Sequence, residues 1–240
     1  MGLKSRYVEV TRSLREVARS AGLLDVLESS SLPQARYLRS LFSVYDAEDL
    51  ARLDLPWWSY RAIRAVDRFL DMRPGARVFE FGSGASTPWL ARRAGSVHTV
   101  EHDTEFIGVV RRILDGLDNV ELHVVEAVPA DDVAGPTVRS EREGHEHLDF
   151  SDYVATIDRV GGPFDLIVVD GRARVECLRR SLPHLAPDGA IVFDDVERRR
   201  YAPALSMPGT RAHVLRGVTP SLPFPTSTAI LRPVNPATSA

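Results

Sequence analysis

Acidic residues recur at the ends of short apolar runs in this chain, where they can bind ligands and transfer protons. Five of them occupy such positions: Glu80, Glu101, Asp170, Asp194 and Asp195. A carboxylate at the end of a strand can accept the hydroxyl protons of a ribose, act as a general base or ligate a hard metal ion. These residues therefore predict a site that combines cofactor binding with acid–base chemistry.

A glycine turn lies between the first of these runs and a helix. Residues 78–87 read Val-Phe-Glu-Phe-Gly-Ser-Gly-Ala-Ser-Thr. Gly82 and Gly84 allow a sharp turn and the close approach of a ligand to the backbone. Ser86 and Thr87 can cap the helix that follows. A strand, a glycine loop and a helix N-terminus in this order predict a nucleotide-cofactor site.

The composition is that of an ordinary globular protein. The chain has 240 residues, 44% of them hydrophobic, enough for one large α/β domain or a domain with an extension. Its formal net charge of −3 provides no general attraction for nucleic acid or an anionic membrane. The single Cys177 cannot build a disulfide framework or a zinc site, and the opening MGLKSRYVEV lacks the apolar core of a signal peptide. We therefore expect a cytoplasmic protein without a membrane span, for which nucleic acid is an unfavoured partner.

Residues 1–74 have the pattern of a helical segment. Apolar residues at helix spacing form one face of a first helix: Val10, Leu14, Val17, Ala21 and Leu24. Gly22 breaks that helix near its end, and residues 35–44 predict a second. Asp54 and Pro56 mark the start of a third. This layer is too apolar to stand alone in water, so we expect an N-terminal helical cap that packs on the following domain.

From residue 75 to residue 240 the pattern alternates between strand and helix. Apolar, β-favouring runs predict strands at 77–81, 97–101, 120–125, 164–170 and 190–194, and a closing pair at 213–216 and 228–231. Such alternation predicts a mainly parallel, doubly wound α/β sheet with helices on both faces. Two stretches are expected to be irregular: a long polar loop at 127–148, of the kind that forms a lid, and the loop that holds Pro220, Pro223 and Pro225.

The glycine loop and Glu101 fit either a dinucleotide or an adenosine-containing cofactor. Glu101 lies 19 residues after Gly82, where a carboxylate can accept both hydroxyl protons of a ribose. A dinucleotide fingerprint requires a third glycine where this chain has Thr87, and no plausible Tyr-x-x-x-Lys pair is found. The acid at Glu80 also suits a positively charged ligand better than a pyrophosphate. An NAD(P)-dependent oxidoreductase is therefore the second interpretation.

In four places the chain resembles the class I S-adenosylmethionine-dependent methyltransferases. The matching pieces are Glu80-Phe81-Gly82-Ser83-Gly84 with Ser86-Thr87, Val100-Glu101-His102-Asp103, the run from Phe164 to Gly171, and Phe193-Asp194-Asp195. The resemblance covers roughly residues 76–232. It implies a Rossmann-like, doubly wound sheet of seven strands in the order 3-2-1-4-5-7-6, whose last strand is antiparallel. It also implies that residues 1–74 lie outside the family core and supply contacts to the methyl acceptor.

The resemblance implies S-adenosylmethionine as the cofactor and indicates which residues contact it. Gly82 and Gly84 would flank the methionine part, and Glu101 would hold the ribose. The full predicted set of cofactor contacts is Glu80, Gly82, Ser83, Gly84, Ser86, Thr87, Glu101, His102 and Asp170. A tight turn that binds no ligand is the alternative interpretation of the two glycines.

The acids after the fourth and fifth predicted strands are the candidates for the chemistry. The predicted catalytic residues are Asp170 and Asp194, as bases for a hydroxyl acceptor, and Arg172, as the partner of an acceptor carboxylate or phosphate. Some small-molecule O-methyltransferases of the catechol type place acids here around Mg²⁺, which implies a metal site of Asp170, Asp194 and Asp195. The Asp-Gly-Arg after the fourth strand departs from that pattern. A helix cap at Asp194 or Asp195 and a metal-free base at Asp170 or Asp194 are the alternatives.

Together these residues predict an enzyme that transfers the methyl group of S-adenosylmethionine to a hydroxyl of a small-molecule acceptor, in secondary metabolism. The acceptor contacts are expected in the cap, where Trp57, Trp58 and Tyr60 either line an aromatic pocket or pack in its core. The alternatives are an N-methyltransferase acting on an amine or a peptide, an NAD(P)-dependent oxidoreductase, and a non-catalytic binding protein. A homodimer is left open.

Overall fold

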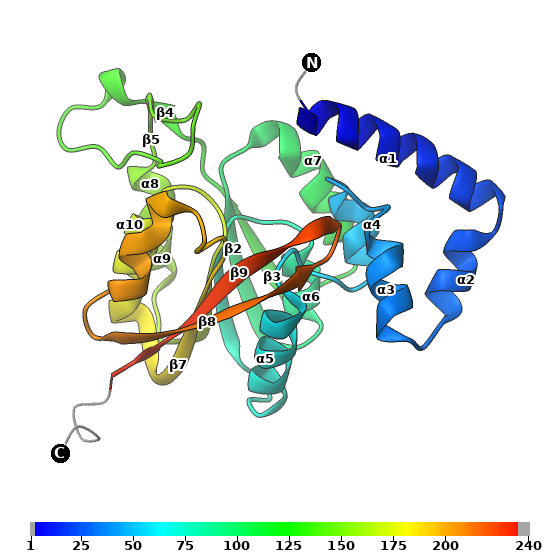
Figure 1. Ribbon diagram of the computed structural model, residues 1–240. Coiled ribbons are helices and arrows are strands. Elements are labelled where there is room, and N and C mark those ends of the chain that lie inside the picture. Colours follow the sequence, from blue (N-terminus) through cyan, green and yellow to red (C-terminus); the bar gives the residue numbers. More distant parts are fainter. Residues whose placement is uncertain (1–2, 235–240) are drawn as a thin grey trace.

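A seven-stranded sheet forms the centre of the protein, and the computed structural model describes the backbone of residues 3–234 (Figure 1). The strands lie in the order β3-β2-β1-β6-β7-β9-β8. Their bounds are β1 (Arg77–Phe81), β2 (Ser96–Glu101), β3 (Val120–Val124), β6 (Phe164–Val169), β7 (Leu185–Phe193), β8 (Thr210–Thr219) and β9 (Leu222–Pro233). The first five pair in parallel, and β9 is antiparallel to both of its neighbours. Counted along the chain, the order is 3-2-1-4-5-7-6, so the predicted topology is confirmed.

Both faces of the central strands are buried, which is why their sequences are apolar throughout. In β1, Val78 belongs to the core on one face of the sheet and Phe79 to the core on the other. The helices on the Val78 side are α5 (Tyr60–Asp71), α6 (Ser86–Ala91) and α7 (Thr104–Ile113). Those on the Phe79 side are α8 (Ser151–Val154), α9 (Thr156–Val160) and α10 (Arg174–Ser181), with the 3₁₀ segment η3 (Arg199–Ser206). The doubly wound arrangement is therefore the predicted one.

The two closing strands are longer than predicted. Only Pro220 and Ser221 separate β8 from β9, so Pro223 and Pro225 lie inside β9 and not in a loop. Among the described residues, β9 pairs with β7 only through Ala229–Leu231, which leaves one edge of β9 without a strand partner near the hairpin tip. A proline lacks the amide proton, and such an edge tolerates that loss.

Residues 127–148 form the irregular segment that the sequence predicts, with little regular structure. They contain a small antiparallel pair, β4 (Val128–Pro129) with β5 (Leu148–Asp149), and one 3₁₀ turn, η1 (Ala130–Asp132). In Figure 1 this green segment projects from the sheet next to α8.

Four helices precede α5: α1 (Leu3–Ser20), α2 (Leu23–Ser29), α3 (Pro33–Ser40) and α4 (Ala47–Arg52). Gly22 separates α1 from α2 with a left-handed φ of 70°, as the sequence predicts. The apolar face of α1 is turned outward, because Val10, Leu14 and Val17 are 57%, 54% and 65% exposed, whereas Leu24 of α2 is buried. The expected apolar contact between this face and the domain is therefore not made. Within residues 3–234, no helix is both long and apolar enough to cross a membrane.

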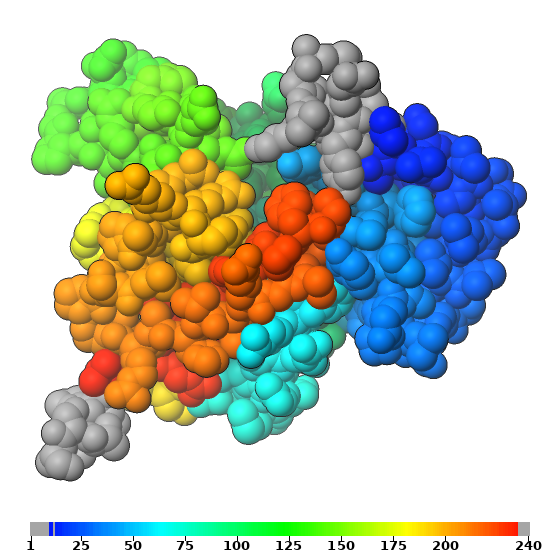
Figure 2. Space-filling model, in the orientation of Figure 1, coloured from blue at the N-terminus to red at the C-terminus, as the bar shows by residue number. Residues whose placement is uncertain are grey.

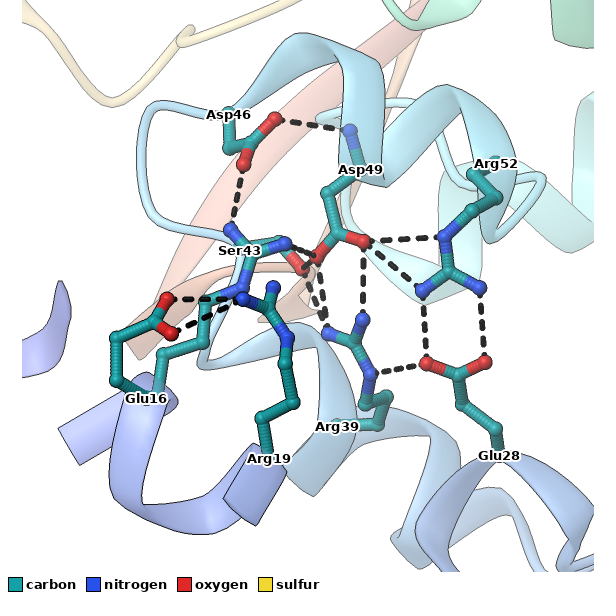
Figure 3. Close-up of polar contacts among 9 residues, drawn as sticks. Glu16, Arg19, Glu28, Arg39, Ser43, Asp46, Asp49 and Arg52 are labelled. Carbon is teal, nitrogen blue, oxygen red and sulfur yellow. Dashed lines mark hydrogen bonds and ion pairs between the residues drawn. The ribbon is translucent and has the colours of Figure 1, made fainter. Parts of the chain in front are cut away.

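Ion pairs tie these helices to one another and fix how α1 is rotated (Figure 3). Arg39 of α3 is 2% exposed and donates to Glu28 of α2 and to Asp49 of α4. Arg15 of α1 pairs with Asp46 at 2.5 Å and with Asp49 at 3.0 Å. Because Arg15 must face inward to reach these carboxylates, the apolar row on another side of α1 faces away from the domain.

Candidate active site

The loop after β1 passes directly against the loop after β6. Gly82 has a φ of 93°, and a Cβ atom added there would lie 2.5 Å from Cα of Gly171. In contrast, a Cβ atom added at Gly84 meets none of the described atoms within 4 Å. Gly82 is therefore required by the contact between two strand-end loops, whereas Gly84 leaves open space that a ligand can approach.

Glu80 lies beneath this loop, out of reach of solvent. Its carboxylate accepts hydrogen bonds from the hydroxyls of Ser86, Thr87 and Thr99, at 2.5, 2.6 and 2.9 Å. Complete burial raises the pKa of Glu80 to about 7, and the three hydroxyl donors oppose the rise only in part. Thr87 also accepts a hydrogen bond from the amide of Gly84 at 3.0 Å. Glu80 and Thr87, two predicted cofactor contacts, thus hold the loop from behind.

Glu101 ends β2 and is oriented by backbone amides. Its Oε2 accepts from the amide of Ser83 at 3.1 Å, and its Oε1 accepts from the amides of His102 and Asp103 at 2.8 and 2.9 Å. The residue is only 4% exposed, so the carboxylate cannot turn freely. Each carboxylate oxygen offers two lone pairs, which leaves Oε2 able to accept a further hydroxyl donor beside the glycine loop.

Asp170, Asp194 and Asp195 converge at the carboxyl ends of β6 and β7, as the sequence predicts for neighbouring strands. Each offers an oxygen within 4.8 Å of the other two. Burial raises the pKa of Asp170; Arg174 opposes the rise and Asp195 adds to it. Burial and the other two acids raise the pKa of Asp194 well above its ordinary value, although the hydroxyl of Thr228 donates to it at 2.6 Å. Burial and mutual repulsion therefore favour a bound proton or another cation at this acid cluster.

Arg174, which is not among the predicted site residues, is the main counter-charge of the cluster. It is 5% exposed, pairs with Asp170 at 2.9 Å and with Asp195 at 3.3 Å, and donates to the backbone oxygen of Asp194. Arg198 also pairs with Asp195, at 2.9 Å. The signal that could have identified it in the sequence is its position just after the short loop that follows β6, four residues after Asp170, where a base can pair with the strand-end acids.

A cavity of about 450 Å³ connects the glycine loop with the acid cluster. The predicted site residues that line it are Gly82, Ser83, Gly84, Ser86, Glu101, His102, Asp170, Arg172, Asp194 and Asp195. Glu80 and Thr87 are absent from its wall, consistent with their place behind the loop. The volume lies within the range of about 300–1,000 Å³ that is usual for small-molecule sites.

The irregular segment 127–148 reaches the rim of this cavity. Its Arg142 lines the cavity together with Arg172. Burial and the charge of Arg142 lower the pKa of Arg172. The ring of His145 lies 5.9 Å from that of His102, measured between centroids. The segment thus forms part of the wall, and a closing motion stays a prediction.

The opposite wall combines Trp57, one of the aromatic residues that the sequence offers for an acceptor pocket, with residues that sequence reasoning did not connect with the site. Tyr45 and Trp57 contribute from the N-terminal region, and Ser221 and Phe224 contribute from the β8–β9 hairpin tip. The indole of Trp57 donates to the hydroxyl of Ser221, and the rings of Tyr45 and Trp57 meet edge-on at 6.2 Å. Tyr45 and Phe224 are 60% and 56% exposed. The mouth of the cavity is therefore partly aromatic.

The sequence allows Trp57, Trp58 and Tyr60 either to line an aromatic pocket or to pack in the core, and the structure places each of them differently. Trp57 lines the cavity. Trp58 is fully buried, yet its indole Nε1 donates to Oδ2 of Asp170 at 3.3 Å, so it supports the acid cluster from below. Tyr60 packs against the core and meets the ring of Tyr37 edge-on at 6.2 Å.

These residues fit both groups that the sequence predicts. Open space at Gly84 and the remaining lone pair of Glu101 suit a nucleoside with free ribose hydroxyls, and the nearby acids suit the positive charge of a sulfonium. The acid cluster also fits Mg²⁺, since it offers three carboxylate oxygens within 4.8 Å of one another. Arg174 would compete with the ion for Asp170 and Asp195.

Parts of this chain are similar in sequence to known proteins. Residues 79–196 match the family described as "Methyltransferase domain". Over 71 residues the chain is 38% identical to the ribosomal RNA small subunit methyltransferase A of Moorella thermoacetica. The shared segment is 29% of this chain and 25% of that relative, so this chain spans about a quarter of the length of the relative it matches.

Two solved structures share the fold at low sequence identity. The O-methyltransferase from Bacillus cereus has a TM-score of 0.56 at 18% identity, with 95% of this chain and 100% of that one covered. The O-methyltransferase TomG from Streptomyces achromogenes has a TM-score of 0.54 at 21% identity, with 82% and 90% of the two chains covered. At such identities the likeness establishes the fold alone. From the strand-end motifs, the sheet order and the family match over residues 79–196, we conclude that the chain carries a class I S-adenosylmethionine-dependent methyltransferase domain.

Proposed function

We propose that the protein transfers the methyl group of S-adenosylmethionine to a hydroxyl of a small-molecule acceptor. The observation that carries this proposal is the acid cluster of Asp170, Asp194 and Asp195 on the wall of the cavity that the glycine loop also lines. A hydroxyl must lose its proton as it attacks, and a carboxylate whose pKa is raised by burial is a stronger base than an exposed one. The family match favours this reaction over the NAD(P)-dependent alternative.

The chain's own residues would hold the reactants in line. The cofactor supplies an electrophilic methyl group when it is bound. Glu101 would accept its ribose hydroxyls, and Gly84 would let it approach the backbone. Asp170 is oriented in advance by Trp58 and Arg174, so its carboxylate can receive the acceptor's proton without rearrangement. Such alignment lowers the barrier of a displacement by removing the entropic cost of orientation at the moment of reaction.

A divalent cation and an anion-binding residue belong to the same proposal. Asp170, Asp194 and Asp195 would hold Mg²⁺, whose charge favours the deprotonated form of an acceptor oxygen. Arg172 on the rim would pair with a carboxylate or phosphate of the acceptor. Without the ion, Asp170 or Asp194 would act as the base by itself.

The aromatic mouth of the cavity supports a small acceptor. Rings at Tyr45, Trp57 and Phe224 can contact a planar apolar molecule on its way to the acid cluster. TomG is described as involved in tomaymycin synthesis, and we extend that setting, secondary metabolism, to this chain as part of the proposal. The relative from Moorella thermoacetica is named for ribosomal RNA. RNA is therefore the second candidate acceptor.

Binding and turnover test the proposal separately. Glu101→Gln should weaken S-adenosylhomocysteine binding, measured by calorimetry, at least about tenfold, because it replaces a charged acceptor of hydroxyl protons. Asp170→Asn should weaken that binding less than Glu101→Gln does, while transfer of labelled methyl to a panel of hydroxyl compounds falls about 10²–10⁴-fold. Asp118→Asn, at an exposed position after α7, is the matched control and should behave as the wild type.

The metal and the acceptor are checked in the same assay. Excess chelator should abolish turnover and added Mg²⁺ should restore it, while S-adenosylhomocysteine binding stays unchanged. Full turnover in excess chelator would exclude a requirement for a divalent cation in catalysis. Transfer to amines or to ribosomal RNA but to no hydroxyl compound would overturn the proposed acceptor, and binding that Glu101→Gln leaves unchanged would overturn the cofactor site.

A further inference from the structure

Three side chains with metal-binding atoms meet near the edge of the sheet, outside the active-site cavity. His98 lies in β2, and Glu121 and His123 lie in the edge strand β3. In the parallel register His98 is opposite Glu121, and Val100 is opposite His123. Because alternate residues of a strand point to the same face, all three side chains lie on the face to which Val100 and α9 belong.

The separations between their ligand atoms are those of a metal site. Nδ1 of His98 lies 3.5 Å from Nε2 of His123 and 3.3 Å from Oε2 of Glu121. Nε2 of His123 lies 3.6 Å from Oε1 of Glu121. Two ligands bound at the usual zinc distances and the tetrahedral angle are about 3.3 Å apart. All three residues thus offer a ligand atom within 4.8 Å of the other two.

The surroundings leave these atoms available. Burial lowers the pKa values of His98 and His123, which favours the neutral imidazole that a metal ion requires. Two guanidinium groups lie nearby, but both are already engaged. Arg77 donates to two backbone oxygens, and Arg159 donates to a backbone oxygen and a hydroxyl. Glu121 is 63% exposed and contributes the negative charge that a cation requires.

The ligand chemistry selects the kind of ion. Two imidazole nitrogens and one carboxylate suit zinc and related transition-metal ions, whereas Mg²⁺ prefers oxygen ligands alone. A groove of about 480 Å³, lined by these three residues and by α9, leaves room for water as a fourth ligand. This site and the acid cluster thus differ both in place and in the ion that they fit.

We infer that His98, Glu121 and His123 bind a divalent transition-metal ion, zinc in the first place, as a structural site. The ion would join the edge strand β3 to β2 through side chains, in addition to the backbone pairing. Securing β3 matters because an edge strand has a partner on one side only. Since β2 ends at Glu101, the ion would also stabilise the strand that presents a proposed cofactor ligand.

Metal titration of the full-length, tag-free protein tests this inference. Protein stripped of metal is titrated with Zn²⁺ against a chromogenic chelator, and with Co²⁺ while visible absorption is recorded. We expect the protein to bind one equivalent of Zn²⁺ at this site. With Co²⁺ we expect the absorption bands of a four-coordinate site with nitrogen and oxygen ligands. His98→Gln and His123→Gln should each weaken the metal affinity roughly 100-fold and remove the Co²⁺ bands. Loss of a residue that only supports a ligand already costs about 10–100-fold, so loss of a ligand itself should reach the upper end of that range. His213→Gln, on an exposed stretch of β8, is the matched control and should bind as the wild type.

A second variant separates binding from folding. Glu121→Gln changes an exposed side chain, so it should fold as the wild type by circular dichroism and still lose Zn²⁺ affinity at least about tenfold. Asp170→Asn should keep the site. A wild-type protein that takes up no Zn²⁺, binding that none of the three ligand variants weakens, or loss of the site in Asp170→Asn would each overturn the inference.

Discussion

At the scale of single residues, the two loop glycines have different physical tasks although the sequence presents them alike. Gly82 combines a left-handed φ with a backbone contact to Gly171, so it supports the fold. Gly84 has open space where a side chain would project, which leaves its backbone accessible to a ligand. Glu80 and Thr87 beneath the loop fix its shape through hydroxyl and amide hydrogen bonds.

Substitution should separate the two glycines. Gly82→Ala should lower the free energy of unfolding by about 3 kcal/mol, because a left-handed backbone costs an L residue about 1–2 kcal/mol and overpacking adds a similar amount. Gly84→Val should change that free energy by less than about 1 kcal/mol. It should also weaken S-adenosylhomocysteine binding at least about tenfold. Urea denaturation and calorimetry measure the two effects, and a Gly84→Val variant that binds normally would locate the cofactor elsewhere.

At the scale of elements, charged side chains hold the short N-terminal helices in place. Helices such as α2, α3 and α4 are too short to be stable alone. Hydrogen bonding from Arg52, then from Arg39, lowers the pKa of Glu28 to about 2. Burial alone would raise the pKa of Asp49, but hydrogen bonds from Arg39 and Ser43 outweigh it and lower that pKa to about 2. Both carboxylates therefore contribute stability that is complete above about pH 5 and is lost as the pH falls toward 2.

The contribution of the ion pairs in the cap to the free energy of unfolding should depend on pH. Asp49→Asn should lower the free energy of unfolding by about 3 kcal/mol at pH 7, since it removes one of the two carboxylates that pair with the buried Arg39. The difference from the wild type should shrink as the pH falls from about 4 to 2, where Asp49 itself becomes protonated. Glu16→Gln, in the exposed pair with Arg19, is the control and should cost less than about 0.5 kcal/mol. Urea denaturation between pH 2.5 and 7 measures this, and an equal loss at both ends would contradict it.

At the scale of the whole molecule, the cap packs directly against the β8–β9 hairpin. Figure 2 shows the hairpin tip, in red-orange, against the light blue residues of the cap. The hydroxyl of Tyr37 donates to the backbone oxygen of Leu222 at 3.0 Å, and that of Ser59 donates to Leu215 at 2.8 Å. Helix α5, which the sequence assigns to the cap, belongs to the same core as the sheet. The active-site cavity is consequently walled by residues from both ends of the chain.

The chain should therefore unfold in a single transition. Circular dichroism, which follows the helices, and fluorescence of Trp57, Trp58 and Trp89, which follows the junction, should give the same thermal midpoint. S-adenosylhomocysteine at a hundred times its Kd should add about 2.7 kcal/mol and move both midpoints up together by about 5–10 °C. A cap that melts first, with the ligand shift confined to a second transition, would instead show two independent domains.

Local patterns in the sequence were sufficient for the sheet and for the inner side of the candidate site. Strand runs, turn glycines and strand-end acids are each properties of a few neighbouring residues, so they can be recognised without knowing any contact. Once the strands are parallel, their carboxyl ends share one edge of the sheet. Gly82, Glu101, Asp170 and Asp194 must then meet there, as they do in the cavity.

The sequence by itself thus determined which runs form strands and which residues line the inner wall of the site, and its resemblance to the methyltransferase family implied the strand order. The tertiary structure alone decided which remote segments meet opposite that wall and what supports it. Tyr45 and Phe224 form the mouth only because two remote segments meet, and the meeting of His98 with His123 depends on a register between strands. The outward apolar row of α1 has the same origin, since the ion pairs of Arg15 with other helices fix its rotation. Contacts of this kind join residues far apart in the chain, and no local periodicity encodes them.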